Sequence, residues 1–95
     1  MAKGYVIASI TVTDPVKYAE YVKSATLAIQ KFGGKPLVRG GKCETLEGEA
    51  RMRNVVLEFA DYATARAYYQ SPEYQAAIQL RAGAGVANIV VVEGA

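Results

Sequence analysis

The chain has 95 residues, of which 52% are hydrophobic and 21% are charged, and its formal net charge is +2. A chain of this length predicts a single domain over residues 1–95, and the composition is that of a globular protein rather than a disordered one. The 11 basic residues are scattered, and no apolar run approaches the roughly 20 residues of a membrane span, so we expect neither a nucleic-acid-binding protein nor a membrane-spanning one.

The first third of the chain predicts a strand followed by a long helix. Residues 5–12 alternate between a fully apolar face and a mixed face, which is typical of a strand in two environments. Residues 13–34 carry apolar side chains at helical spacing. Asp14 suits the N-cap of this helix and Pro15 its first position, while Gly33 suits a left-handed C-cap.

Two further strands are predicted next. Residues 35–48 read as a strand interrupted by Gly40 and Gly41, because glycines inside a strand pattern indicate a bulge or a close backbone approach. Residues 53–60 form another strand pattern, whose apolar face carries Val55, Leu57 and Phe59.

The last third predicts a broken helix and a final strand. Residues 61–70 form a helix capped by Asp61, and Ser71 with Pro72 interrupts it, because the residue before a proline avoids the helical region. Ser71 then becomes the N-cap of a new short helix. Residues 82–87 are expected to be a flexible connection, and residues 88–94 the last strand.

This order of elements predicts an α+β, ferredoxin-like βαββαβ fold, with a four-stranded antiparallel sheet and the helices on one face. The other face is left bare, and it is too apolar for free exposure and too polar for a dry core. We therefore expect a homodimer, a dimeric α/β barrel in which a second copy covers this face and leaves an interior pocket. The side chains expected on the bare face are Tyr5, Ile7, Ser9, Thr11, Val56, Glu58 and one set of valines from the last strand.

The chain contains no histidine and one cysteine, Cys43. No Ser-His-Asp or Cys-His catalytic site and no imidazole-bound metal is then expected, nor any cofactor. Cys43 cannot form an intrachain disulfide and is more typical of a structural residue than of a reactive thiol. The N-terminal segment lacks the sustained apolar core of a signal peptide, so we expect a cytoplasmic protein.

Arg39 is the first candidate ligand-binding residue. It lies beside two glycines that would let a ligand approach the backbone, and a guanidinium can hold a carboxylate through two hydrogen bonds. The alternative is an ion pair with Glu58 or Glu44.

Tyr69, Ser71, Tyr74 and Arg81 are further candidates around the restart of the helix. Ser71 suits an N-cap, and the free backbone N–H groups of the helix that it begins could also face an anion. The tyrosines suit packing with their hydroxyls at a wet edge, and Arg81 suits the helix C-terminus. The competing hypothesis is a pocket built from Arg39, Tyr69, Ser71 and Tyr74, with Arg81 as a further ligand-binding candidate.

Glu58 is the candidate general base, because a carboxylate inside the barrel would have a raised pKa. The alternative is a salt bridge to Arg39 or Arg53. Ser9 and Thr11 are predicted to line the same cavity as Glu58.

Four segments in order carry a family resemblance: GYVIASITVTDP with YAEYV at the start, LVRGG at 37–41, SPEYQAA at 71–77 and IVVVEG at 89–94. With these motifs the whole chain resembles the family known as domain of unknown function 1330. The resemblance implies the dimeric α/β-barrel superfamily, whose members include cofactor-free monooxygenases, isomerases and haem-degrading enzymes, and it implies no particular reaction.

Three functions remain open from the sequence. The first is a cytoplasmic homodimer that binds a small polar or anionic organic molecule between sheet and helices. The second is a cofactor-independent enzyme, an isomerase, lyase or monooxygenase-like protein acting on a small organic acid. The third is a structural module without a ligand.

Overall fold

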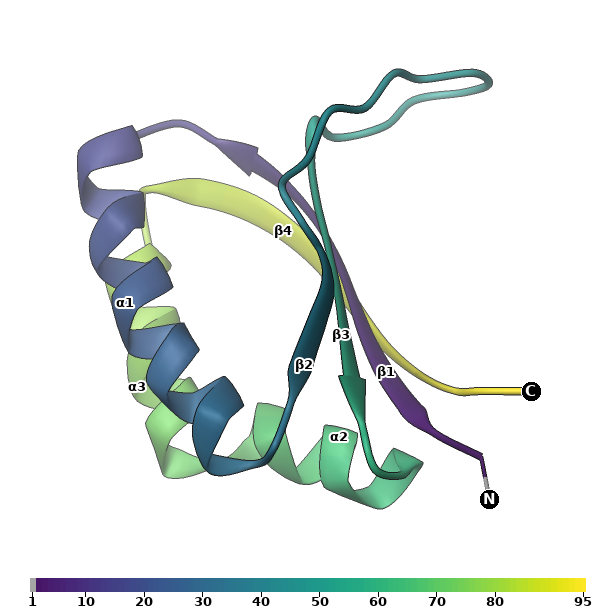
Figure 1. Ribbon diagram of the computed structural model, residues 1–95. Helices are drawn as coiled ribbons and strands as arrows, with labels where there is room; N and C mark the ends of the chain where they lie inside the picture. The colour runs from purple at the N-terminus through teal and green to yellow at the C-terminus, as the bar shows by residue number, and fades with distance from the viewer. Residues whose placement is uncertain (1) are drawn as a thin grey trace.

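The structure, a computed structural model, describes residues 2–95. Its four strands form one antiparallel sheet in the order β2-β3-β1-β4, and the helices lie against one face of that sheet (Figure 1). The elements are β1 (Gly4–Val12), α1 (Pro15–Lys31), β2 (Lys35–Arg39), β3 (Arg53–Phe59), α2 (Tyr62–Gln70), α3 (Pro72–Arg81) and β4 (Gly85–Glu93). The ferredoxin-like arrangement predicted from the sequence is confirmed, with the second helical element divided into α2 and α3.

The helices begin where the sequence predicts. Asp14 accepts a hydrogen bond from the backbone N–H of Lys17, and Asp61 accepts one from Thr64. Ser71 caps α3 by accepting from the N–H of Tyr74 at 3.1 Å. Each cap satisfies a backbone donor that the first helical turn leaves free.

The strand predicted over 35–48 is wrong in its length, since β2 ends at Arg39. Gly40 donates its N–H to the carbonyl of Asn54 at 2.8 Å and has a φ of +68°, a conformation that turns the chain out of the sheet and favours glycine. The residues from there to Met52 form a long connection that projects beyond the end of the sheet (Figure 1).

The last strand begins earlier than predicted. Residues 82–87 were expected to be a flexible connection, but β4 starts at Gly85, which pairs with Val12. A Cβ atom at Gly85 would lie 2.7 Å from the carbonyl oxygen of Thr11, so the two strands approach closely here only because the residue is glycine.

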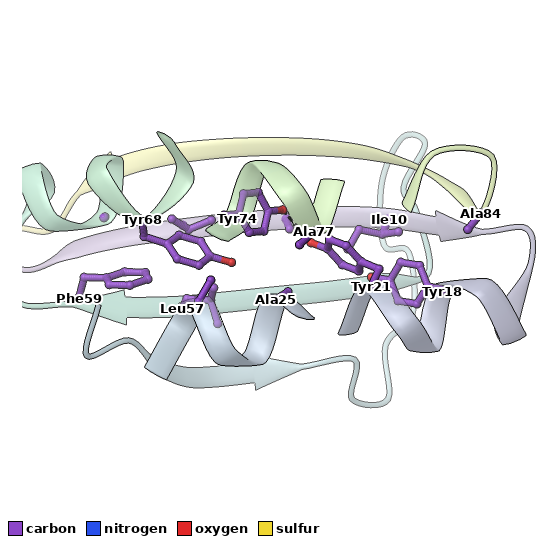
Figure 2. Close-up of a cluster of buried hydrophobic side chains, with 14 residues drawn as sticks. Ile10, Tyr18, Tyr21, Ala25, Leu57, Phe59, Tyr68, Tyr74, Ala77 and Ala84 are labelled. Carbon is purple, nitrogen blue, oxygen red and sulfur yellow. Dashed lines mark hydrogen bonds between the residues drawn. The ribbon is translucent and has the colours of Figure 1, made fainter. Parts of the chain in front are cut away.

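The core lies between the sheet and the helices and is rich in tyrosine and alanine (Figure 2). The small alanines of α1 and α3 let these two helices pack closely, and the tyrosine rings occupy most of the space that remains above the sheet. The largest fully buried side chains are Tyr74, Phe59 and Ile10. No helix within residues 2–95 is long and apolar enough to cross a membrane.

The opposite face of the sheet carries the apolar surface that the sequence predicts. Strand pairing places four apolar side chains in one row across all four strands, namely Val38, Val56, Ile7 and Val90. Ile7 is 39% exposed and Val90 is 56% exposed. No segment among residues 2–95 covers this row. We call this whole side of the sheet, away from the helices, the open face.

Candidate functional site

A cavity of about 50 Å³ lies between α1 and the sheet. Aliphatic side chains of β1, β3 and β4 form its floor, and four tyrosine rings from the three helices form much of its roof. Its polar lining consists of Tyr18, Tyr21, Thr26, Arg39, Arg53, Tyr68 and Tyr74. No Asp or Glu belongs to this lining, so its side chains offer hydrogen-bond donors and no negative charge.

Tyr21 and Tyr74 form the polar centre of the roof. Their hydroxyl oxygens lie 2.7 Å apart, and Nη1 of Arg81 lies 3.4 Å from the first and 3.3 Å from the second. The ring of Tyr68 packs on that of Tyr74, with centroids 4.8 Å apart. Figure 2 shows the three tyrosine hydroxyls directed into the layer between sheet and helices.

These tyrosines are proton donors rather than bases. Burial raises the pKa of Tyr21, of Tyr68 and of Tyr74 above the ordinary value of 10.0, since the anionic form would lose its hydration. The phenols therefore stay protonated at neutral pH. The hydroxyl of Tyr68 takes part in none of the side-chain hydrogen bonds of residues 2–95, so it remains free to donate to a bound molecule.

Arg39 and Arg53 bring two positive charges to the same cavity. Arg39 donates one hydrogen bond, from Nη2 to the hydroxyl of Thr26 at 2.8 Å. The guanidinium of Arg53 lies over the ring of Tyr18, 5.5 Å from its centroid, and its Nε is buried without an acceptor. Neither arginine forms an ion pair with any acid in the described part of the chain.

Of the residues predicted from the sequence, Arg39 and Tyr74 line this cavity, and Arg81 reaches it through the hydroxyl of Tyr74. Tyr69 is 36% exposed and is absent from the cavity lining. Ser71 is buried at the start of α3, where its hydroxyl also donates to the carbonyl of Tyr68, so its hydrogen bonds are local ones. The predicted set therefore does not form one pocket.

Glu58 lies on the open face, away from the arginines. Its carboxylate accepts a hydrogen bond from the hydroxyl of Tyr5 at 2.9 Å. The predicted salt bridge to Arg39 or Arg53 is wrong, because alternation along a strand sends residue 53 to the helix side and residue 58 to the opposite side. Arg39 pairs opposite Val55 and so also points to the helix side.

Ser9 and Thr11 share the open face with Glu58. Together with Asn88 and the end of the 40–52 connection they line a separate hollow. Arg51 closes over it by donating to Asn88 at 2.7 Å and to Thr11 at 2.9 Å. These residues cannot contact a ligand in the cavity on the helix side of the same protomer.

The model of the family described as "Domain of unknown function (DUF1330)" matches residues 3–95. The chain belongs to this family. No curated protein is significantly similar to this DUF1330 chain.

Solved structures with the same fold are distant in sequence. The protein RPA0582 of unknown function from Rhodopseudomonas palustris is 18% identical over 96% of this chain and 81% of its own, with a TM-score of 0.72. A dimeric protein of unknown function and ferredoxin-like fold from Bacteroides fragilis is 16% identical over 96% of this chain and 95% of its own, with a TM-score of 0.65. SnoaB, a cofactor-independent oxygenase from Streptomyces nogalater, is 10% identical over 97% of this chain and 92% of its own, with a TM-score of 0.61. At these identities the likeness establishes the fold of the DUF1330 chain alone.

Five polar residues of the DUF1330 cavity are absent from the site predicted from the sequence, namely Tyr18, Tyr21, Thr26, Arg53 and Tyr68. Tyr21 and Arg53 were both visible in the patterns, the first on the apolar stripe of the long helix and the second in phase with Val55 on the third strand. The sequence prediction named Tyr69 as a ligand-binding residue, whereas Tyr68 lines the cavity. Its spacing of three from the buried Ala65 could have shown which tyrosine of this pair faces the core.

Proposed function

We propose that this DUF1330 chain binds a small anionic organic molecule in the cavity between the sheet and the helices. The observation that carries the proposal is the unbalanced chemistry of the lining, which contains two guanidiniums and four phenols but no carboxylate. Arg53 is half-buried, and its buried Nε has lost its hydration without gaining an acceptor, whereas Arg39 is exposed and contributes a hydrated charge. A ligand with negative charge would supply the missing acceptors.

The proposal includes a homodimer formed through the open face. The row of Val38, Val56, Ile7 and Val90 offers an apolar strip across the sheet, and polar groups flank it. The Bacteroides fragilis protein of the same fold is itself described as dimeric. Covering this strip with the same strip of a second copy would remove it from water by a two-fold arrangement, which is the usual symmetry of such contacts.

The ligand proposal is tested by a thermal-shift screen of small metabolites on the purified chain, followed by titration of each hit. We expect Arg39→Ala to weaken the binding of a hit about ten-fold or more, since a charge-assisted hydrogen bond is lost. Arg66→Ala is the matched control, because Arg66 is exposed on α2 and lies outside the cavity lining. Hits that bind Arg39→Ala as tightly as the wild type would overturn the site.

The dimer is tested by sedimentation velocity. Ile7→Lys, which puts a charge in the middle of the apolar row, should give monomers. Val16→Lys is the control, since Val16 is 82% exposed on α1 and outside the open face. A wild-type chain that sediments as a monomer at micromolar concentration would remove the dimer from the proposal. The cytoplasmic location stays a prediction, which fractionation of the source cells would check.

A cofactor-independent enzyme is the second candidate. The observation that favours it is the Tyr21, Tyr74 and Arg81 cluster, in which protonated phenols and a guanidinium could stabilise negative charge forming on a bound acid. The version that uses Glu58 as a base in this cavity has no support in the geometry, because that carboxylate lies on the other face of the sheet. If a hit from the screen is converted to a new compound, Tyr74→Phe should slow turnover more than it weakens binding.

A further inference from the structure

We infer that the ligand is a small monocarboxylic acid with an apolar body, and that Arg53 together with Arg39 holds its carboxylate. This inference rests on the function proposed above and narrows it to one chemical class. It also adds a residue, Arg53, that sequence reasoning treated only as a salt-bridge partner.

The sheet brings the two arginines together. Arg39 of β2 pairs opposite Val55 of β3, and Arg53 lies two residues before Val55 on the same face. Such diagonal neighbours on adjacent strands are about 7–8 Å apart, close enough for two long side chains to reach one anion. Two adjacent like charges repel each other, and an anion between them would turn this repulsion into attraction.

The guanidinium of Arg53 has hydrogen-bond donors without acceptors, and the groups around it hold it in place. It forms no hydrogen bond to any of residues 2–95, and it stacks over the ring of Tyr18. A glycine leaves room for this guanidinium, because a Cβ atom at Gly40 would lie 2.4 Å from Nη1 of Arg53. The glycine after Arg39 therefore sets both the exit of the chain from β2 and the space for the second guanidinium.

The rest of the cavity selects the remainder of the ligand. Beyond the arginines its walls are aliphatic side chains, among them Val6, Ile10 and Leu57, and the faces of tyrosine rings. A phosphate or sulfate group would use the charges but would leave these walls without an apolar partner. A planar carboxylate fits the fork of a guanidinium, and a cavity of about 50 Å³ has room for a short hydrocarbon group but not for an aromatic ring, since a cavity that binds benzene has about 150 Å³.

The test titrates the full chain with propionate and butyrate, with the neutral amides propionamide and butyramide, and with inorganic phosphate, and it follows binding by NMR chemical shifts. We expect each acid to bind about ten-fold tighter or more than its amide, because the charge-assisted pair is lost in the amide. Both acids should also bind tighter than phosphate, which lacks the apolar group.

Three variants assign the effect to Arg53. Arg53→Gln should abolish the preference for acid over amide, and Arg53→Lys, which keeps the charge without the planar fork, should reduce it. Gly40→Ala should weaken acid binding without changing the net charge, by displacing the guanidinium. Gly48→Ala is its control, because Gly48 has the same φ of +68° and a Cβ atom there meets nothing within 4 Å. Circular dichroism verifies that each variant is folded, and if Arg53→Gln is not, Arg53→Lys and Gly40→Ala carry the test.

The outcomes separate this inference from the proposed function. Equal binding of acids and amides, phosphate binding as tightly as the acids, or an unchanged acid preference in the folded Arg53 variants would overturn the monocarboxylate while leaving an anionic or polar ligand in place. If the acids fail but the metabolite screen yields another ligand that depends on Arg39, the inference alone falls. If no small organic molecule binds at all, both fall.

Discussion

The hydroxyl oxygens of Tyr21 on α1 and Tyr74 on α3 lie 2.7 Å apart, although 53 positions separate the two residues in the chain. This contact joins the two helices in the roof of the cavity, and Arg81 adds a positive charge beside both oxygens. Burial of both rings makes the hydrogen bond hard for water to replace.

Removing either hydroxyl should destabilise the fold. We expect Tyr21→Phe and Tyr74→Phe each to lower the free energy of unfolding by about 1 kcal/mol, and the double variant to lose less than the sum. Urea denaturation of the four proteins measures this coupling. Tyr62→Phe is the control, since its hydroxyl takes part in none of the side-chain hydrogen bonds of residues 2–95. Additive losses would show that the two hydroxyls do not interact.

Alkaline pH should weaken the fold through the same buried rings. Burial raises the pKa of Tyr68 in the folded state above the 10.0 of an exposed tyrosine. Above about pH 10 the unfolded chain therefore binds fewer protons than the folded chain, so the free energy of unfolding falls as pH rises, by up to about 1.4 kcal/mol per pH unit for each such group.

The measurement compares urea midpoints at about pH 8 and about pH 11, on either side of the ordinary tyrosine pKa. Tyr68→Phe isolates one group, because the Tyr68 hydroxyl has no protein partner to lose. This variant should lose less stability than the wild type over the same pH range. An identical loss in both proteins would mean that Tyr68 titrates normally in the folded chain.

Gly4 is expected to tolerate no side chain. A Cβ atom there would lie 2.2 Å from the backbone carbonyl oxygen of Asp61, at the point where β1 meets the start of α2. Gly4→Ala should cost roughly 1–3 kcal/mol of stability, because a backbone contact must move apart. Gly41→Ala, in open space, should change stability by less than about 0.5 kcal/mol. Thermal unfolding measures the stability of both variants. Equal stability of the two would contradict the close packing of β1 on α2.

Ser71 is expected to act as a helix cap rather than as a ligand contact. Ser71→Ala should lower the free energy of unfolding by about 1 kcal/mol, while Ser71→Thr should retain most of the capping. Ser24→Ala, in the middle of α1, is the control. Ligand affinity should be the same in folded Ser71→Ala as in the wild type, and a loss of affinity without a loss of stability would return Ser71 to the binding site.

The helix caps, and the side chains that each helix or strand turns toward the core, follow from the amino-acid order, because they depend on interactions within a few residues. Asp14, Asp61 and Ser71 each bond to a backbone N–H three positions ahead, and such contacts are readable along the chain. The apolar open face is readable for the same reason, since alternate residues of a strand point to opposite sides.

Which residues line the cavity together could be seen only in the folded chain. Arg39 and Arg53 line one cavity because β2 pairs with β3 in one register and Gly40 leaves room, and neither condition is visible in a local pattern. Glu58 was expected beside these arginines and lies on the other side of the sheet. Local rules assign a residue to a face, but contacts between faces of different elements are set by strand register and by how the helices pack on the sheet, which depend on the whole chain at once.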